Sequence, residues 1–449
     1  MTIKFLGAVG GVTGSNYLLE DSDYNILVDC GLFQGGSVEE NKNWEDFKFN
    51  PSDIDALILT HSHIDHIGLV PKLYRDGFRG KIYSTFPTRD FAEIFLTDTQ
   101  KLMAQYANDH GKDILYDLKD IEGAMSLFKP VDYHQKIDLG SNISLIFYDA
   151  GHILGSSFVK IFFDKKSIVF SGDLGNPPVP IVKDTEFIDE ADYVVIESTY
   201  GDRIHDVGKN RKEELENVIE ETFTKKGVVL IPAFALERTQ ELMYEINDLV
   251  LNSRIPKIPV YIDSPLAIKA TKVYPNYIRY FDEESKNFFA NHNNPLDFSD
   301  LKFVESTEES KALDEDIAPK IIIAGSGMSN GGRILFHEKV FLPIESTTLV
   351  IVGYQVKGTL GRALQDGAKN IRIYGEDISV KARVVSLDSY SAHADQPKLL
   401  YWLKKINRKV KKIFVVHGEE KAKIDFQVKI KDELGIDAYI PKSEEKIIL

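Results

Sequence analysis

The sequence predicts an α/β protein in which one domain is inserted into another, and two observations lead to this prediction. Short β-strand patterns, partly joined as hairpins, alternate with helical patterns up to about residue 200. From about residue 206 long helices separate the strands, and the shorter strand pattern returns near Ile371. We therefore predict a first domain formed by residues 1–205 and 371–449, with residues 206–370 as an α/β insert.

The strands and helices of the first domain are short and apolar in pattern. Strands are expected at Ile3–Leu6, Asn16–Leu19, Asn25–Val28, Ala56–Leu59, Ile143–Tyr148, Phe158–Phe163, Ser167–Phe170, Tyr193–Ile196 and Lys412–Val416. Helices are expected at Thr88–Tyr106, Ile114–Phe128 and Lys421–Leu434. Because hairpins join some of these strands, a mixed sheet is favoured over a doubly wound parallel one.

The insert differs from the first domain because long helices separate its strands. Its helices are expected at Arg211–Phe223 and Leu236–Leu251, and its strands at Val228–Ile231, Val260–Ile262 and Ile321–Ala324. The stretch Asn276–Glu315 is polar and is expected to be irregular.

Composition bounds the class of protein. The 449 residues are 43% hydrophobic and 11% aromatic, which supports packed cores and excludes a disordered chain. No apolar run approaches the roughly 18 residues that a membrane helix needs. Cys30 is the single cysteine, which excludes an intrachain disulfide and fits a reducing compartment. Met1 leads directly into a strand pattern without a leader, so we expect a soluble cytoplasmic protein without membrane contact.

The net charge of −15, from 54 basic and 69 acidic residues, argues against loose binding of nucleic acid. An acidic surface repels a phosphate backbone at long range. The balance leaves open a narrow cleft in which metal ions and a few arginines would hold such a substrate.

A dense group of metal-binding side chains follows the strand Ala56–Leu59. Three histidines and an aspartate occur within six residues, namely His61, His63, Asp65 and His66. Imidazole and carboxylate are the usual zinc ligands. On an extended stretch, His61 and His63 point the same way, whereas Asp65 and His66 fall on the following turn and could serve a second ion.

Further ligands are expected where other strands end. His152, Asp173 and His417 each follow an apolar strand and lie beside glycine. Taken alone, each is more often a capped turn residue than a ligand. Beside the His61–His66 cluster, the metal interpretation becomes the favoured one.

These motifs carry a resemblance to a known family. Asp29, the His61–His66 cluster, His152 and Asp173 occur in the order found in the metallo-β-lactamase superfamily. Glu197, His393 and His417 resemble motifs A, B and C of its β-CASP branch, and the chain resembles prokaryotic homologues of the cleavage and polyadenylation specificity factor endonuclease subunit. The resemblance implies an αββα sandwich with an inserted α/β β-CASP domain.

The resemblance also implies two Zn²⁺ ions. One would be held by His61, His63, His152 and Asp173, and the other by Asp65, His66, Asp173 and His417. Asp65 is also expected to act in catalysis. Asp29 would support the ligands without binding metal.

His393 is the expected general acid for the departing ribose oxygen, and Glu197 would orient it. Taken alone, His393 could be a surface turn residue and Glu197 a strand-end cap. RNA-acting members of the branch carry histidine at the position of His417, which favours RNA over DNA.

Three segments of the insert resemble β-CASP motifs that would contact phosphate. Ser326, Gly327, Met328 and Arg333 lie in a glycine-rich turn at the expected start of a helix, where backbone amides can hold phosphate. Arg238 and Arg362 could each pair with phosphate. An ordinary tight turn, and for Arg238 an ion pair with Glu237 or Glu241, are the structural alternatives.

The leading hypothesis is a dinuclear-zinc ribonuclease that hydrolyses single-stranded RNA, expected to be an endonuclease with 5′-exonuclease action left open. A homodimer is also left open. The alternatives are a hydrolase of small thioesters or lactones, and a non-catalytic subunit of an RNA-processing complex. The basic run Lys404–Lys412 is interpreted as a solvated helix end in preference to an RNA track.

Overall fold

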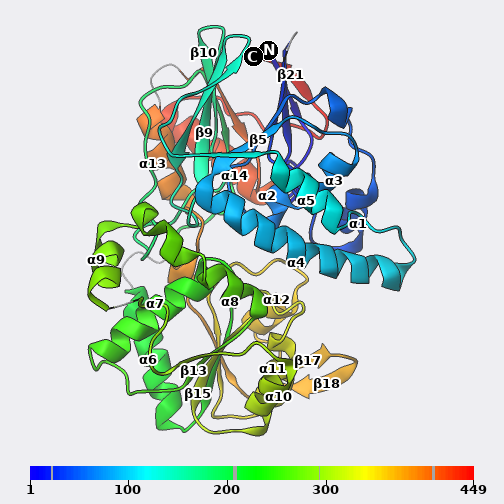
Figure 1. The fold of residues 1–449 in the computed structure, drawn as a ribbon. Helices are drawn as coiled ribbons and strands as arrows, with labels where there is room; N and C mark the ends of the chain where they lie inside the picture. The colour runs from blue at the N-terminus through cyan, green and yellow to red at the C-terminus, as the bar shows by residue number, and fades with distance from the viewer. Residues whose placement is uncertain (22–23, 206–209, 293, 407–409) are drawn as a thin grey trace. The chain divides into compact units, whose positions relative to one another are not determined.

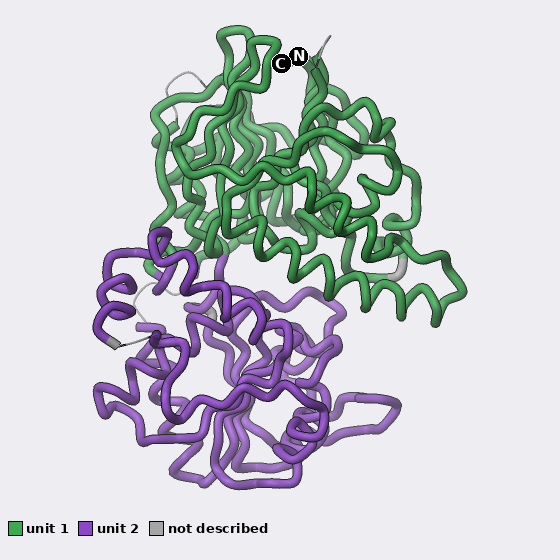
Figure 2. The backbone as a smooth tube through the Cα atoms, in the orientation of Figure 1, with its two compact units in different colours: residues 1–178, 182–204, 393–449 green, residues 179–181, 205–392 purple. Residues whose placement is uncertain are grey.

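The computed structural model describes residues 1–21, 24–205, 210–292, 294–406 and 410–449 (Figure 1). They form two compact units (Figure 2). Unit 1 comprises residues 1–178, 182–204 and 393–449, and unit 2 comprises residues 179–181 and 205–392. The expected start of the insert at residue 206 lies outside the described residues.

Unit 1 contains two mixed sheets. The first has the strand order β21-β1-β2-β3-β4-β5-β6 and the second the order β20-β11-β10-β9-β8-β7. The strands of the first sheet are β1 (Thr2–Phe5), β2 (Tyr17–Glu20), β3 (Asn25–Val28), β4 (Ala56–Ile58), β5 (Lys81–Thr85), β6 (Phe128–Val131) and β21 (Lys446–Ile448). Those of the second are β7 (Ile137–Gly140), β8 (Ile143–Asp149), β9 (Ser157–Phe163), β10 (Lys166–Phe170), β11 (Tyr193–Ile196) and β20 (Lys412–Val415).

Helices cover the outer face of each sheet (Figure 1). On the first sheet they are α2 (Ile64–Ile67), α3 (Val70–Arg75), α4 (Phe86–His110) and α5 (Leu118–Ser126), and on the second α13 (Gln396–Ile406) and α14 (Glu420–Leu434). The short helix α1 (Ser37–Asn41) precedes them in the chain. The inner faces share one core, in which Phe5 and Ile58 of the first sheet join Phe147 and Ile161 of the second. Alternation of inward and outward side chains along each strand produces this layering. The expected αββα sandwich is confirmed.

Unit 2 is built on a parallel sheet with helices around it. The sheet order is β14-β13-β15-β12-β16-β19, and every pairing in it is parallel. Its strands are β12 (Val228–Pro232), β13 (Val260–Asp263), β14 (Leu301–Phe303), β15 (Lys320–Ala324), β16 (Thr348–Ile351) and β19 (Arg383–Ser386), and β17 (Asn370–Ile373) and β18 (Glu376–Ser379) form a separate hairpin. Its helices are α6 (Arg211–Thr224), α7 (Arg238–Leu251), α8 (Pro265–Thr271), α9 (Glu283–His292), α10 (Thr307–Glu315), α11 (Ile334–Phe341) and α12 (Leu360–Gln365).

Unit 2 extends further along the chain than residues 206–370. Residues 371–392 lie in it because β19 pairs with β16 and completes the parallel sheet. Residues 179–181, which precede Tyr193 by a short loop, also belong to unit 2: the Ile181 N–H donates to Ser285 Oγ at 2.9 Å, and the Ile181 carbonyl accepts from the Asp282 N–H at 3.0 Å. Contacts between residues distant in sequence assign these segments to unit 2. The pattern of strands along the sequence does not reveal such contacts.

Two local predictions were wrong, and helix caps explain both. The stretch Asn276–Glu315 contains α9, β14 and α10; α10 begins at a capping box in which Ser306 and Glu309 satisfy each other's backbone N–H groups. The helix expected at Ile114–Phe128 is confined to α5, because Asp117 caps its start and Phe128 opens β6. Within the described residues, no helix combines the length and apolar character that crossing a membrane requires.

Candidate metal and catalytic centre

The candidate centre lies in unit 1, where several strands end. His61, His152 and Asp173 follow β4, β8 and β10, while Glu197 and His417 follow β11 and β20. Because β10, β11 and β20 are parallel neighbours, their carboxyl ends meet at one edge of the sheet. The topology therefore gathers side chains that are up to several hundred residues apart.

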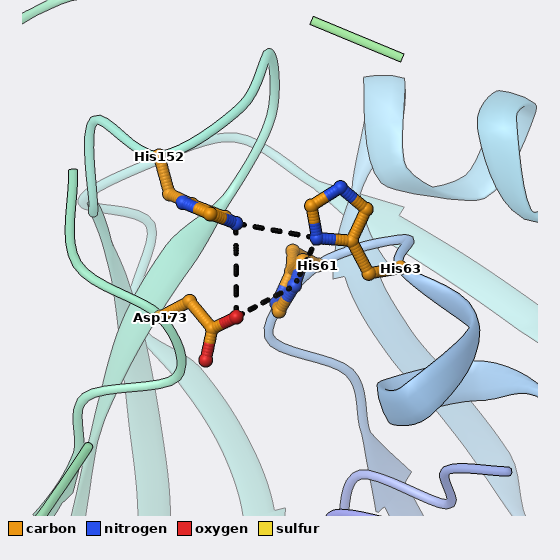
Figure 3. A group of neighbouring side chains, drawn as sticks. All are labelled: His61, His63, His152 and Asp173. Atoms are coloured by element: carbon orange, nitrogen blue, oxygen red, sulfur yellow. Dashed lines mark hydrogen bonds and ion pairs between the residues drawn. The ribbon is translucent and has the colours of Figure 1, made fainter. Parts of the chain in front are cut away.

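Four donor groups converge in a first cluster (Figure 3). Nδ1 of His63 lies 3.1 Å from Nε2 of His61 and 3.2 Å from Nε2 of His152. Oδ2 of Asp173 lies 3.5 Å from Nε2 of His61 and 3.6 Å from Nε2 of His152. Donor atoms at 2.0–2.1 Å around a tetrahedral zinc ion would be roughly 3.3 Å apart, so this set fits such an ion.

The protonation of the first cluster also suits a metal. Burial lowers the pKa of His63 to about 4, and burial together with the neighbouring His66 lowers the pKa of His61 well below its usual value. Both imidazoles are therefore neutral at pH 7, which is the form that coordinates metal. Oδ1 of Asp173 is buried without a hydrogen-bond partner among the described residues, which leaves an acceptor for a cation.

A second group adjoins the first and shares Asp173. Asp65, His66 and His417 have donor atoms within 4.8 Å of one another. Nε2 of His66 lies 3.4 Å from Oδ1 of Asp173, and Nε2 of His417 lies 3.7 Å from Asp65 and 3.8 Å from Asp173. Burial opposes protonation of His66, but the carboxylates of Asp173 and Asp29 hold its pKa well above its usual value. A cation that binds Nε2 of His66 would displace the proton from this nitrogen.

Asp29 forms a hydrogen bond with His66 of this second group. Its Oδ2 accepts a hydrogen bond from Nδ1 of His66 at 2.7 Å, and its Oδ1 accepts from the Thr60 N–H at 2.8 Å. Once His66 loses its second proton, the bond to Nδ1 leaves Nε2, which faces Asp173, as the nitrogen with a lone pair. Asp29 has a φ of 57°, and its side chain is 1% exposed, so both backbone and carboxylate are held in place.

Asp29→Asn is expected to weaken metal binding at the second group by about 10- to 100-fold. Asparagine tolerates the positive φ, but its amide must either donate to Nδ1 of His66 or lose the bond to Thr60. An amide that donates would place the imidazole proton on Nε2, where it blocks coordination. Zinc titration with a competing chelator measures the affinities, and Asp138→Asn, at an exposed site on β7, is the control. Unchanged zinc affinity in Asp29→Asn would contradict the role of Asp29.

Glu197 and His393 form a pair beside Asp173. Nδ1 of His393 lies 3.4 Å from Oε2 of Glu197 and 3.8 Å from Oδ2 of Asp173. Glu197 is 1% exposed and accepts from the Leu174 N–H at 2.5 Å and from Oγ1 of Thr199 at 2.6 Å. Burial lowers the pKa of His393, but the Glu197 carboxylate outweighs this and raises the pKa to about 9. His393 therefore carries a proton at pH 7, and its side chain is 19% exposed.

Several hydroxyl groups that sequence motifs do not indicate contact these candidate residues. Oγ1 of Thr60 donates to Oδ2 of Asp29 at 2.9 Å, and Oγ of Ser15 lies 3.0 Å from Nδ1 of His417. Ser171 Oγ accepts from the Glu197 N–H at 3.0 Å. Thr60 and Ser171 adjoin strand ends, which is a local signal, whereas Ser15 is separated from His417 by most of the chain and carries none.

The predicted phosphate contacts all lie in unit 2. Ser326, Gly327 and Met328 form a turn before α11, in which Ser326 N–H donates to the Gly331 carbonyl at 3.2 Å and Ser326 Oγ accepts from the Asn330 N–H at 3.0 Å. The helix begins at Ile334, directly after this turn, with Arg333 at its N-cap. Nη1 of Arg333 pairs with Oδ1 of Asp263 at 2.5 Å and Nη2 donates to the Glu305 carbonyl at 2.8 Å.

The other two arginines also have acidic partners. Arg238 is 4% exposed and pairs with Glu241, which is the structural alternative that the sequence left open. Arg362 pairs with Asp366 at 3.0 Å and its side chain is 33% exposed. Of the basic run Lys404–Lys412, residues 407–409 lie outside the described residues; Lys404 pairs with Glu433, and Lys411 with Asp192.

Comparison with known proteins adds independent information. Residues 18–189 match a family model described as metallo-beta-lactamase superfamily domain, residues 239–364 match the Beta-Casp domain, and residues 377–441 match the Zn-dependent metallo-hydrolase RNA specificity domain.

Relatives match along nearly the whole chain. A ribonuclease of Thermus thermophilus is 40% identical over 420 residues, which cover 94% of each chain. An RNase J-like protein of Methanocaldococcus jannaschii is 34% identical over 98% of this chain and 97% of its own. Transcription termination factor FttA of the same organism is 32% identical over 99% of this chain and 71% of its own.

Proposed function

Because this chain belongs to the metallo-β-lactamase superfamily and to its β-CASP family, we propose that it is a zinc-dependent ribonuclease that hydrolyses phosphodiester bonds in single-stranded RNA. The observation that carries the proposal is the joint presence, around Asp173, of two groups of metal donors and the Glu197–His393 pair. The match of residues 377–441 to an RNA specificity domain supports RNA as the substrate.

The arrangement supports two zinc ions that share Asp173. His61, His63 and His152 would complete one site, and Asp65, His66 and His417 the other. When bound, two zinc ions supply Lewis-acid stabilisation of charge at a phosphodiester and lower the pKa of an attacking water. Asp65, with a side chain 18% exposed, would help to hold the metal and would accept the proton that the attacking water loses.

His393 would supply the proton that the leaving group needs. As the water oxygen bonds to phosphorus, the bond from phosphorus to the 3′ oxygen breaks and that oxygen needs a proton. With Nδ1 of His393 turned toward Glu197, the opposite nitrogen Nε2 would donate this proton. The products would be a 5′-phosphate and a 3′-hydroxyl.

Two rival functions fit these residues less well. A hydrolase of small thioesters or lactones has no need for a second proton donor supported as His393 is by Glu197 and Thr199. A non-catalytic subunit has no need for a complete ligand set, and the grouping of His61, His63, His152 and Asp173, and of Asp65, His66 and His417, as possible metal donors argues against this rival. Turnover of a small ester without cleavage of RNA would support the first rival, and purified protein that binds no zinc would support the second.

We expect the zinc-loaded protein to cut a circular single-stranded RNA, because the reaction proposed here needs no chain end. The measurement is a time course on circular RNA, on end-labelled linear RNAs with 5′-triphosphate or 5′-monophosphate, and on DNA of matched sequence, each with and without chelator. Cleavage should require zinc and spare DNA. Degradation of linear RNA with an intact circle would show exonuclease action in place of endonuclease action.

A further inference from the structure

A buried cluster of charged side chains in unit 2 has no part in the metal centre. It contains Arg211, Arg238, Glu241, Glu245 and Tyr390. Tyr390 is fully buried, and Glu241 and Glu245 are 1% and 3% exposed. Two buried guanidinium groups and two buried carboxylates lose much of their hydration on folding. This loss costs free energy, so a gain in stability does not by itself account for the cluster.

The members of the cluster are joined by specific contacts. Nη2 of Arg211 lies 2.8 Å from Glu241 and its Nε lies 2.9 Å from Glu245. The Tyr390 hydroxyl donates to Oε2 of Glu245, and the guanidinium of Arg211 lies 4.2 Å from the centre of the Tyr390 ring. Arg238 pairs with Glu241 on the same helix, α7. The cluster therefore ties Tyr390 to both α6 and α7.

The cluster lies near the points where the chain enters and leaves unit 2. Arg211 is the first residue of α6, close to where the chain enters unit 2, and Tyr390 lies three residues before His393, where the chain leaves it. Ser389 adds a second tie, because its hydroxyl donates to Oε2 of Glu214 on α6 at 2.7 Å. After the crossing, the Ala394 N–H donates to the Leu174 carbonyl at 2.8 Å. The residues on either side of His393 thus each have a hydrogen bond, Ser389 and Tyr390 within unit 2 and Ala394 within unit 1.

We propose that Tyr390, through its bond to Glu245, is a positioning residue for His393. The inference rests on the function proposed above, in which His393 protonates the departing 3′ oxygen. A proton donor must be held to within about 1 Å of its working position, and a misplacement of that size lowers the rate by about 100-fold. Tyr390→Phe removes only the hydroxyl that connects Tyr390 to α7, and leaves Glu245 with an unpaired oxygen.

The test compares Tyr390→Phe on two RNAs that differ in one atom. One carries the ordinary 3′ oxygen at the cleaved linkage, and the other carries sulfur there. A sulfur leaving group departs as a thiolate and does not need the proton from His393. Relative to the unaltered protein, Tyr390→Phe is expected to lower kcat on the oxygen substrate by about 10- to 100-fold with KM little changed. On the sulfur substrate its kcat should fall less than about threefold, and His393→Ala should show the same selectivity more strongly.

Tyr274→Phe is the matched control. Tyr274 is also fully buried in unit 2, and its hydroxyl donates to Oε2 of Glu237 at 3.1 Å, but it lies far from His393 in sequence. This variant should treat the two substrates alike. Ser389→Ala, at a partly exposed position, repeats the test with less risk to folding and should show the same selective loss on a smaller scale.

An equal loss on both substrates in Tyr390→Phe and Ser389→Ala, or no loss on either, would overturn the positioning role. Failure of the unaltered, zinc-loaded protein to cleave RNA would instead overturn the proposed function, so the two failures are distinguishable.

Discussion

Asp173→Asn is expected to abolish RNA cleavage and to remove bound zinc. The carboxylate of Asp173 lies within reach of both donor groups, with Oδ2 beside His61 and His152 and Oδ1 beside His66. Asparagine has nearly the same shape, but it brings no negative charge to a buried site with many nitrogen donors. We expect cleavage to fall by on the order of 1,000-fold or more, since both the metal chemistry and its supporting charge are lost together.

Zinc content per chain by mass spectrometry, together with the rate on single-stranded RNA, checks this expectation. Asp437→Asn, at a side chain 86% exposed, is the matched control and should keep both zinc and activity. Far-ultraviolet circular dichroism should stay unchanged in both variants, because the αββα core does not depend on Asp173. Full activity in Asp173→Asn would refute the shared-ligand assignment, whereas a loss of activity with two zinc ions retained would place Asp173 outside the metal shell.

His393→Ala is expected to separate chemistry from metal binding. The proposed role of His393 is to deliver a proton, and removal of a general acid costs about 100- to 10,000-fold in rate. His393 is not needed to complete either group of zinc ligands, so the variant should bind zinc as tightly as the unaltered protein. The two effects together distinguish a general acid from a structural ligand.

The measurements are single-turnover cleavage of RNA and zinc titration on the same preparation. His110→Ala is the control, because His110 is an exposed histidine at the C-terminal end of α4. If His393→Ala loses zinc in parallel with activity, His393 acts as a ligand and the general-acid assignment is wrong. If it cleaves at the normal rate, another group supplies the proton.

The elements that sequence patterns predicted best are those with local signals. The strands before His61, His152 and Asp173 were located to within one or two residues, because each is a buried apolar run that ends at a polar turn. Segments with caps or long-range pairing were predicted less well. β19 belongs to unit 2 through its pairing with β16, and polar residues such as Ser306 and Glu309 start a helix that a search for apolar periodicity overlooks.

The insert shows the same contrast at the level of single residues. Arg238 and Arg333 look alike in sequence as candidate phosphate contacts. In the structure Arg238 forms a buried ion pair with Glu241, its near neighbour in sequence. Arg333 forms an ion pair with Asp263, which is distant from it in sequence. Exposure and the nearest counter-charge are properties of the fold, so motif spacing could not distinguish these roles.

The order of residues specifies the chemistry available to this protein: histidine and aspartate side chains at strand ends that can bind metal, one glutamate and one histidine beyond them, and the motif order that identifies the family. These are local properties, because donor type belongs to the side chain and strand ends follow from apolar runs. Which of these side chains face one another depends on the fold. The parallel order of β10, β11 and β20 brings Asp173, Glu197 and His417 to one edge, and that order depends on hydrogen bonds between strands far apart in the chain.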